Sequence, residues 1–249
     1  MGNLNAKVSK LCLLCLFIGS ASAQFNSSKL EKEIKRVIPQ FNVTGMVLSI
    51  IQDDSVIFSR AFGWRDAEKK LPITSQSLFN IASCTKAFTA AALAKLESEK
   101  KIAWADKVID YIPEFQLADS YITAELNLID ILTHRSGLGT FYGDLLWYGT
   151  DYSPAEIIHR MRYLPITQDF RSSYGYQNNM YIIAGEIIKN VSGLSWADYI
   201  KENFFIPLEM FNSRTCSEEL KSDMDIAYPH LNGTIQKLYI DDPHAAYSI

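Results

Sequence analysis

The stretch Leu78–Leu96, LFNIASCTKAFTAAALAKL, decides both the fold and the chemistry of this 249-residue chain. An apolar run leads into Ser83 and an alanine-rich segment follows Lys86, which predicts a buried helix that begins near these two residues. Residues three apart lie on one face of a helix, within side-chain reach. A serine at a helix N-terminus also lies near backbone N–H groups that favour negative charge. Ser83 and Lys86 are therefore a candidate nucleophile and proton acceptor.

The S-x-x-K pattern by itself is a weak signal, because about one chance match is expected in a chain of this length. A second match, Ser98–Lys101, falls at the polar end of the same predicted helix, where the helix dipole opposes a serine anion. The motif alone leaves a structural alternative open, in which Ser83 caps the helix and Lys86 is solvated.

The composition indicates an ordinary globular protein, with 48% hydrophobic and 21% charged residues. The formal net charge is −4, and it is −6 without Lys7 and Lys10. A mildly acidic chain without a basic stripe does not favour nucleic acid as a partner.

The N-terminus has the pattern of a targeting segment. Lys7 and Lys10 precede the apolar run Leu11–Gly19, and Ala21–Ala23 forms an A-x-A cleavage motif. The run is too short to span a bilayer as a mature helix, although a signal anchor is an alternative. We expect residues 1–23 to be a signal peptide, and the mature chain to be secreted or periplasmic without a stable membrane span.

Cysteine and histidine usage predicts neither a disulfide framework nor a metal site. Cys12 and Cys15 leave with the predicted signal, and the pairing of Cys84 and Cys216 is left open. The helical position of Cys84 turns it away from Ser83, so we expect a small core residue there. The four histidines are dispersed and form no metal-ligand motif, so we expect no metal and no cofactor.

The order of predicted elements indicates an α+β fold. Residues 28–41 have the periodicity of an amphipathic helix, and residues 45–52 and 55–63 read as two strands joined by a turn at Asp53-Asp54. An antiparallel sheet flanked by helices is therefore expected, with a helical subdomain over about 84–205 inserted into it. Its helical stretches lie near 84–100, 126–133, 153–162, 178–191 and 195–205, and short strand-like pieces follow at 233–236 and 237–240.

A second candidate motif lies about ninety residues after the first. Tyr176-Gln177-Asn178 is a Y-x-N at a predicted loop-to-helix junction. In a loop or strand, positions i and i+2 point the same way, so Tyr176 and Asn178 can face one cleft. A phenol beside a lysine ammonium can exchange a proton with a serine hydroxyl, and an amide can both hold the lysine and donate to a carbonyl.

Ser83-x-x-Lys86 followed by Tyr176-x-Asn178 resembles the penicillin-recognising serine hydrolases, in particular the class C β-lactamase, DD-peptidase and esterase branch. The resemblance runs from about residue 30 to the C-terminus. Three further stretches agree with that branch: Phe62–Asp66 (FGWRD), Leu132–Leu138 (LTHRSGL) and Pro207–Met210 (PLEM), the last with Glu209 where the family usually has glycine.

The resemblance implies a β-lactamase/transpeptidase-like fold and an acyl-enzyme formed on Ser83. Lys86 and Tyr176 would share the proton transfer, Asn178 would orient substrate, and His134 would be structural. The Ser83 N–H would supply half of an oxyanion hole. The implied partner is a small molecule or peptide with an amide, lactam or ester carbonyl, as for β-lactamases, D-alanyl-D-alanine carboxypeptidases and esterases.

The family's third motif, K-T-G or H-x-G, does not occur in this sequence. We therefore expect residues 24–249 to be the N-terminal portion of a longer domain that lacks its C-terminal sheet strands, and expect this form alone to be inactive. The alternative is a truncated non-catalytic pseudo-enzyme or binding protein that retains the fold. The actual substrate and the oligomeric state are left open.

Overall fold

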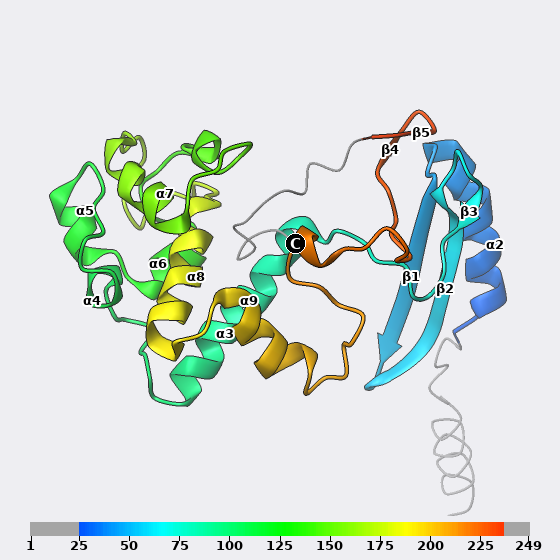
Figure 1. The fold of residues 1–249 in the computed structure, drawn as a ribbon, viewed down its shortest axis with the longest axis horizontal. Helices are drawn as coiled ribbons and strands as arrows, with labels where there is room; N and C mark the ends of the chain where they lie inside the picture. Colours follow the sequence, from blue (N-terminus) through cyan, green and yellow to red (C-terminus); the bar gives the residue numbers. More distant parts are fainter. Residues whose placement is uncertain (1–24, 237–249) are drawn as a thin grey trace, which may run out of the picture. The chain divides into compact units, whose positions relative to one another are not determined.

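A computed structural model describes residues 25–236 of the chain (Figure 1). The predicted signal peptide 1–23 and the strand-like piece 237–240 lie outside these residues. The described chain forms two compact units: residues 25–43 with 48–59, and residues 44–47 with 60–236. Within the described residues, no helix combines the length and the apolar character that crossing a membrane requires.

The first unit begins with helix α2 (Ser27–Val37), which the Asn26 side chain caps by accepting from the Lys29 N–H at 2.8 Å. Such a cap satisfies one of the free donors at a helix start. A 3₁₀ turn, η2 (Ile38–Phe41), continues the helix, as the periodicity over 28–41 predicts. The same unit contains residues 48–59, the part of a hairpin around its turn. Phe25 packs edge-on against Phe58 of this hairpin, with ring centroids 6.0 Å apart.

The sheet follows the sequence prediction closely. Strands β1 (Gly45–Gln52), β2 (Ser55–Asp66) and β3 (Leu71–Pro72) are hydrogen-bonded in the order β1-β2-β3, and β3 runs antiparallel to β2. The predicted turn residues Asp53 and Asp54 both have positive φ, 48° and 58°, as a two-residue hairpin turn requires. The short strand β3 was not predicted.

The second unit contains the remaining helices. In chain order they are η3 (Ala82–Thr85), α3 (Lys86–Ser98), α4 (Val108–Tyr111), α5 (Ser120–Glu125), α6 (Leu128–Leu132), η4 (Asp144–Leu146), α7 (Pro154–Arg160), η5 (Met161–Tyr163), α8 (Asn179–Ser192), α9 (Trp196–Ile200), a π-helical turn η6 (Lys201–Phe205) and η7 (Ser217–Glu219). The five predicted helical stretches are all present, whereas the short α4 and α5 were missed.

Helix α8 is the centre of this unit and packs against α3, α4, α6, α7 and α9 (Figure 1). Its first half is buried all round, from Asn179 to Gly185, whereas Glu186, Lys189 and Asn190 form a polar side in its second half. Helix α3 contributes one stripe, from Lys86 through Thr89 to Leu93 and Leu96. The Thr89 hydroxyl accepts from the Trp196 indole N–H at 3.0 Å inside this core.

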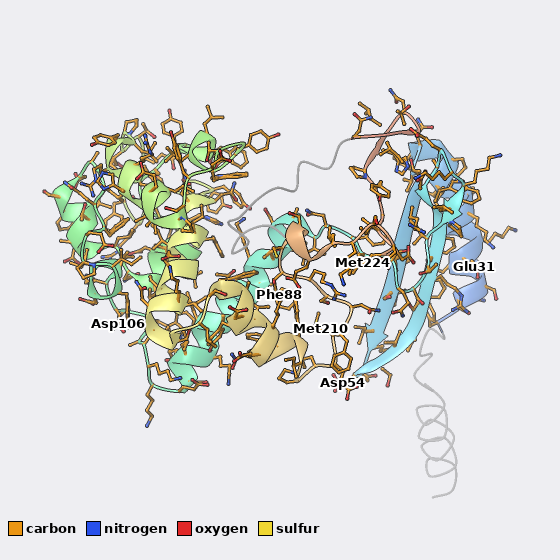
Figure 2. All side chains as sticks on the ribbon, in the orientation of Figure 1. Glu31, Asp54, Phe88, Asp106, Met210 and Met224 are labelled. Carbon is orange, nitrogen blue, oxygen red and sulfur yellow. The ribbon has the colours of Figure 1, made fainter. Side chains whose placement is uncertain are left out.

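Phe88 extends the core toward the end of the helical region (Figure 2), where its ring meets those of Phe204 and Phe205 edge-on at 6.4 and 5.7 Å. Edge-on contacts of this kind are the preferred arrangement of aromatic pairs. They help to fix the π-helical turn that follows α9, a continuation of the predicted helix 195–205.

The last described residues return to the sheet region. Ile226 forms a parallel bridge with Leu78, and Asp225 makes an ion pair with Arg65 at 2.9 Å. A small hairpin follows, formed by β4 (His230–Leu231) and β5 (Thr234–Ile235), in the region where the strand-like piece 233–236 was expected.

The core of the second unit gives a stability prediction. Leu93 is fully buried, so Leu93→Ala removes apolar contacts and leaves a cavity in the α3 stripe. We expect the free energy of unfolding to fall by about 2–5 kcal/mol, measured by denaturant titration. Leu145→Ala makes the same chemical change at a side chain that is 81% exposed, and it should cost less than about 0.5 kcal/mol. Equal losses in the two variants would contradict this core.

Candidate active site

Ser83 and Lys86 lie together at the start of α3. Ser83 is in the 3₁₀ turn η3, Lys86 is the first residue of the α-helix, and Lys86 Nζ lies 3.2 Å from Ser83 Oγ. Lys86 is only 8% exposed, so it is not solvated. No side-chain cap hydrogen bond forms at the start of η3 or of α3. The structural alternative, a capping serine beside a solvated lysine, is therefore not what the structure shows.

The second S-x-x-K match is built differently. Ser98 is the last residue of α3, and its hydroxyl donates to the Lys95 carbonyl at 2.7 Å. Lys101 instead forms an ion pair with Glu99 at 2.9 Å. Ser98 thus ends a helix, as its position in the sequence indicated.

The Y-x-N motif lies in contact with the S-x-x-K motif. The Tyr176 hydroxyl donates to Ser83 Oγ at 2.8 Å, and Lys86 Nζ donates to Asn178 Oδ1 at 2.8 Å. Tyr176 and Asn178 therefore point to the same side of their segment, the first toward the serine and the second toward the lysine. All four predicted site residues form one hydrogen-bonded group.

Backbone contacts hold the segment that carries Tyr176. The Phe141 N–H donates to the Tyr176 carbonyl at 2.9 Å, and the Gly175 N–H donates to the His134 carbonyl at 2.9 Å. Gly175 is needed here because a Cβ at this position would run into the Leu138 carbonyl oxygen. The LTHRSGL stretch singled out in the sequence is therefore the support against which the Tyr176 segment lies.

His134 supports the same segment with its side chain. Its Nδ1 accepts from the Gln177 N–H at 3.1 Å, and its ring lies against the rings of Tyr174, Tyr176 and Tyr181 at centroid distances of 5.6, 4.5 and 5.4 Å. Burial, together with the nearby Lys86 charge, lowers the pKa of His134 from 6.5 to about 4. The imidazole is therefore neutral near pH 7, which keeps Nδ1 available as an acceptor. The structural role expected for His134 fits these contacts.

Burial also sets the electrostatics of Lys86. Desolvation lowers the pKa of the Lys86 ammonium below its ordinary 10.5, while contacts with Tyr176 and the charge of Asp144 act in the opposite direction. Nζ also lies 5.1 Å from the ring centroid of Tyr176 and 5.2 Å from that of Tyr181. Lys86 is thus an amine whose neutral form is more accessible than that of a surface lysine.

Sequence reasoning missed Asp144, which opens η4. Its two carboxylate oxygens accept from Asn178 Nδ2 and from the Trp147 indole N–H, each at 3.1 Å. Burial raises the pKa of the Asp144 carboxyl above its ordinary value, although both hydrogen bonds oppose the shift. Nothing in the sequence links a loop aspartate to an asparagine 34 residues later, so only the fold could reveal the contact.

The core position expected for Cys84 is wrong. Cys84 is exposed and unpaired, whereas the next two residues, Thr85 and Lys86, are buried. The buried stripe runs through Thr85, Lys86 and Thr89 at helical spacing, and at about 100° per residue Cys84 lies on the opposite side of it. Cys216 is half-buried, with its Sγ 3.3 Å from a Glu219 carboxylate oxygen.

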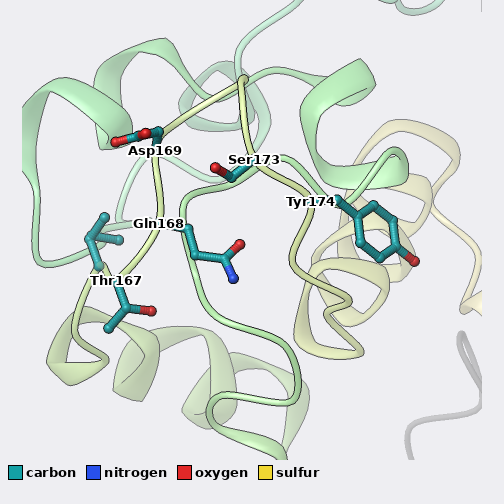
Figure 3. A pocket seen from close by; sticks show the side chains of 6 residues that line it. Thr167, Gln168, Asp169, Ser173 and Tyr174 are labelled. Atoms are coloured by element: carbon teal, nitrogen blue, oxygen red, sulfur yellow. The ribbon is translucent and has the colours of Figure 1, made fainter.

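A separate hollow of about 670 Å³ lies beside the loop that precedes Tyr176 (Figure 3). None of the four predicted site residues lines it; the lining residues are Ile166, Thr167, Gln168, Asp169, Ser173 and Tyr174. Gln168 Oε1 is buried without a hydrogen-bond partner and lies 2.9 Å from the point where a Gly175 Cβ would be. The side chain thus packs against the glycine that shapes the Tyr176 segment. Among residues 25–236, no three His, Cys, Asp or Glu side chains are grouped as a metal site would need.

The fold is of the β-lactamase/transpeptidase type. The sequence model of the Beta-lactamase family matches residues 31–247, and the chain belongs to that family. It is 28% identical over 192 residues to Penicillin-binding protein 4* of Bacillus subtilis (strain 168), an alignment that covers 74% of this chain and 40% of the relative.

Solved structures share the fold of the chain. The octameric penicillin-binding protein homologue from Pyrococcus abyssi matches with a TM-score of 0.73 and 30% identity, over 83% of this chain and 48% of that one. A class C β-lactamase mutant matches with a TM-score of 0.75 and 17% identity, over 91% of this chain and 62% of that one. The predicted α+β fold of the β-lactamase/transpeptidase type is confirmed. The chain spans 33% to 42% of the length of the curated relatives it matches.

The buried imidazole gives a pH prediction. The pKa of His134 is about 4 in the folded chain and about 6.5 in the unfolded chain, so between these values the unfolded state binds more protons. Stability should therefore fall as the pH drops from about 6.5 to about 4. His134→Asn keeps an acceptor near the Nδ1 position without titrating, and it should remove this part of the pH dependence of the unfolding free energy.

His159 provides the matched control, because it is exposed. His159→Asn should leave the pH dependence of the unfolding free energy as it is in the unmodified chain. If His134→Asn and His159→Asn have the same profile between pH 4 and 6.5, the burial of a neutral His134 is refuted.

Proposed function

We propose that this chain belongs to an exported serine hydrolase that forms an acyl-enzyme on Ser83. The observation that carries the proposal is that two side chains contact the Ser83 hydroxyl. Ser83 Oγ lies 2.8 Å from the Tyr176 hydroxyl and 3.2 Å from Lys86 Nζ. A hydroxyl becomes a strong nucleophile when neighbouring groups can take its proton as it attacks.

In the acylation step, Ser83 Oγ forms a bond to the substrate carbonyl carbon while its proton moves to neutral Lys86 or through Tyr176. The resulting tetrahedral oxyanion collapses and breaks the bond to the leaving nitrogen or oxygen, which takes up the proton. Water then attacks the acyl-enzyme, with the same two groups accepting and returning a proton. We assign proton transfer to Lys86 and Tyr176 jointly, because both contact Ser83 Oγ.

Two features support Lys86 as a proton acceptor. The first is burial, which lowers its pKa, and the second is its uncharged hydrogen-bond partner, Asn178. Asn178 accepts a hydrogen bond from Lys86 Nζ with its carbonyl oxygen. Unlike a carboxylate, this amide does not neutralise the charge of the ammonium. A carboxylate in that position would hold the lysine protonated. An amide positions the amine and leaves it able to accept a proton.

The proposed substrates are small molecules or peptides with an amide, lactam or ester carbonyl. Membership of the Beta-lactamase family supports this class, and the matches to a penicillin-binding protein and a class C β-lactamase support amide and lactam chemistry within it. D-alanyl-D-alanine carboxypeptidase, β-lactamase and esterase activities all belong to this proposal. Export rests on the signal-peptide pattern of residues 1–23.

Covalent labelling tests the nucleophile. The complete natural protein that contains this sequence, treated with a fluorophosphonate or a β-lactam, should gain one adduct on the peptide carrying Ser83, measured by mass spectrometry. Ser83→Ala should abolish the adduct. Ser98→Ala, which removes the serine of the second S-x-x-K match, should leave labelling unchanged.

Labelling at Ser98, or its persistence in Ser83→Ala, would overturn the assignment. A folded protein that no carbonyl or phosphonyl reagent labels would instead support the non-catalytic alternative. The 249-residue chain should be tested in parallel, because we expect it to be inactive alone. Cooperative unfolding of that chain together with Ser83 labelling would refute this expectation.

The lowered pKa of Lys86 predicts the pH dependence of labelling. Because only the neutral amine can take the Ser83 proton, the rate should rise with pH and level off above a midpoint below 10.5. Lys86→Arg keeps the positive charge but cannot lose it. The labelling rate should therefore fall by about 10²–10⁴-fold and should no longer rise with pH. If the labelling rate of Lys86→Arg still rises with pH in the same way, the pH dependence belongs to another group.

A further inference from the structure

Asp144 holds the far side of the Asn178 amide. The Asn178 side chain has two ends: its Oδ1 accepts from Lys86 Nζ at 2.8 Å, and its Nδ2 donates to Asp144 Oδ2 at 3.1 Å. The other carboxylate oxygen, Oδ1, accepts from the Trp147 indole N–H at 3.1 Å. Asp144, Asn178, Lys86 and Ser83 therefore form one chain of hydrogen bonds.

The chemistry of these groups permits only one orientation of the amide. An ionised carboxylate accepts hydrogen bonds and cannot donate, and an ammonium donates and cannot accept. If the Asn178 amide turned over, its oxygen would face the Asp144 carboxylate and its NH₂ would face the Lys86 ammonium. Both contacts would then be repulsive. Asp144 thus selects the orientation in which a carbonyl oxygen is presented to Lys86.

Burial strengthens this selection. Asn178 is only 7% exposed, so water cannot easily replace a lost partner of the amide. Asp144 is half-buried, and its remaining oxygen is taken up by the indole of Trp147. The carboxylate is therefore held on both sides, and its position is set by the η4 turn that it opens.

We propose that Asp144 is a positioning residue, which orients the Asn178 amide so that Lys86 Nζ is held beside Ser83 Oγ. The catalytic consequence rests on the function proposed above, whereas the orientation itself does not. Asp144 also acts on Lys86 through its charge. The groups that face the Lys86 ammonium are Ser83, Asn178, Tyr176 and Tyr181, with His134 and Asp144 nearby. Of these, Asp144 bears the negative charge that favours the protonated lysine.

The substitution Asp144→Asn tests the orientation, because an amide cannot accept on both sides. Either the NH₂ of the new amide at position 144 faces the Trp147 N–H, or this NH₂ faces Asn178 and forces the Asn178 amide to turn over. We expect the plateau rate of Ser83 labelling to fall about tenfold or more, the usual effect of losing a buried hydrogen bond to a charged group. Asp151→Asn removes the same charge from an exposed site and should keep the rate within about twofold.

A second substitution should rescue the first. Trp147→Phe removes the indole N–H, so in Asp144→Asn/Trp147→Phe the new amide can turn its oxygen toward Asn178 without a donor facing a donor. The double variant should therefore label faster than Asp144→Asn alone, whereas Trp147→Phe by itself should have a small effect. A role in fold stability alone predicts the opposite, since two losses would add.

The pKa of Lys86 gives a measurement that needs no catalysis. It can be followed by NMR titration of the Lys86 13Cε signal, assigned with Lys86→Arg. Removal of the Asp144 charge, or reversal of the Asn178 amide, should lower the pKa of Lys86 in Asp144→Asn. The rise of the labelling rate with pH should shift to lower pH together with this pKa, and Asp151→Asn should shift neither.

The outcomes separate the two proposals. A lowered Lys86 pKa in Asp144→Asn, in a protein whose Ser83 is never labelled, supports the positioning contact and overturns the proposed function. Normal labelling with an unchanged Lys86 pKa in Asp144→Asn supports the proposed function and overturns the role of Asp144. Failure of Trp147→Phe to rescue the labelling rate also overturns it.

Discussion

The active-site group depends on one constraint, the burial of the Lys86 amine among partners that do not neutralise it. A buried ammonium is costly unless it is hydrogen-bonded, and a paired carboxylate would lower that cost but fix the proton on the lysine. Here the direct partners are a hydroxyl at 3.2 Å and an amide oxygen at 2.8 Å, and the carboxylate of Asp144 lies one residue further away. The chain thereby satisfies the hydrogen bonds of the amine while leaving its charge easy to lose.

The surrounding fold serves to keep that arrangement in place. Lys86 begins the buried stripe of α3, so its backbone position is fixed by the same packing that buries Leu93 and Leu96. Asn178 directly precedes α8, the helix against which most of the others pack. The two residues that meet across the site thus belong to, or adjoin, two helices that pack against each other. Tyr176 lies just outside α8, and the LTHRSGL stretch provides its support instead.

Sequence reasoning recovered the elements and motifs whose signals are local. The hairpin followed from two strand-like runs on either side of the turn at Asp53-Asp54, and the meeting of Ser83 with Lys86 followed from helical spacing. The pairing of Tyr176 with Ser83 was reached through resemblance to a family, because no local rule connects residues 93 apart in the chain. Asp144 was missed for the same reason. Cys84 was misplaced because facing away from Ser83 does not by itself mean facing the core; the buried side of the helix runs through Thr85 and Lys86.

Asn178 shows how far the site departs from local preference. Asparagine is among the residues most favoured at a helix N-cap, where its side chain accepts from a backbone N–H and contributes about 1 kcal/mol. Asn26, Asn127 and Asp119 cap their helices in this way. Asn178 also directly precedes α8, but its backbone is helical there (φ −73°, ψ −40°), whereas these three caps are extended. It makes no side-chain cap, and its oxygen accepts from Lys86 Nζ instead. A cap preference therefore does not predict the contact of Asn178 with Lys86, as is expected where tertiary contacts override local rules.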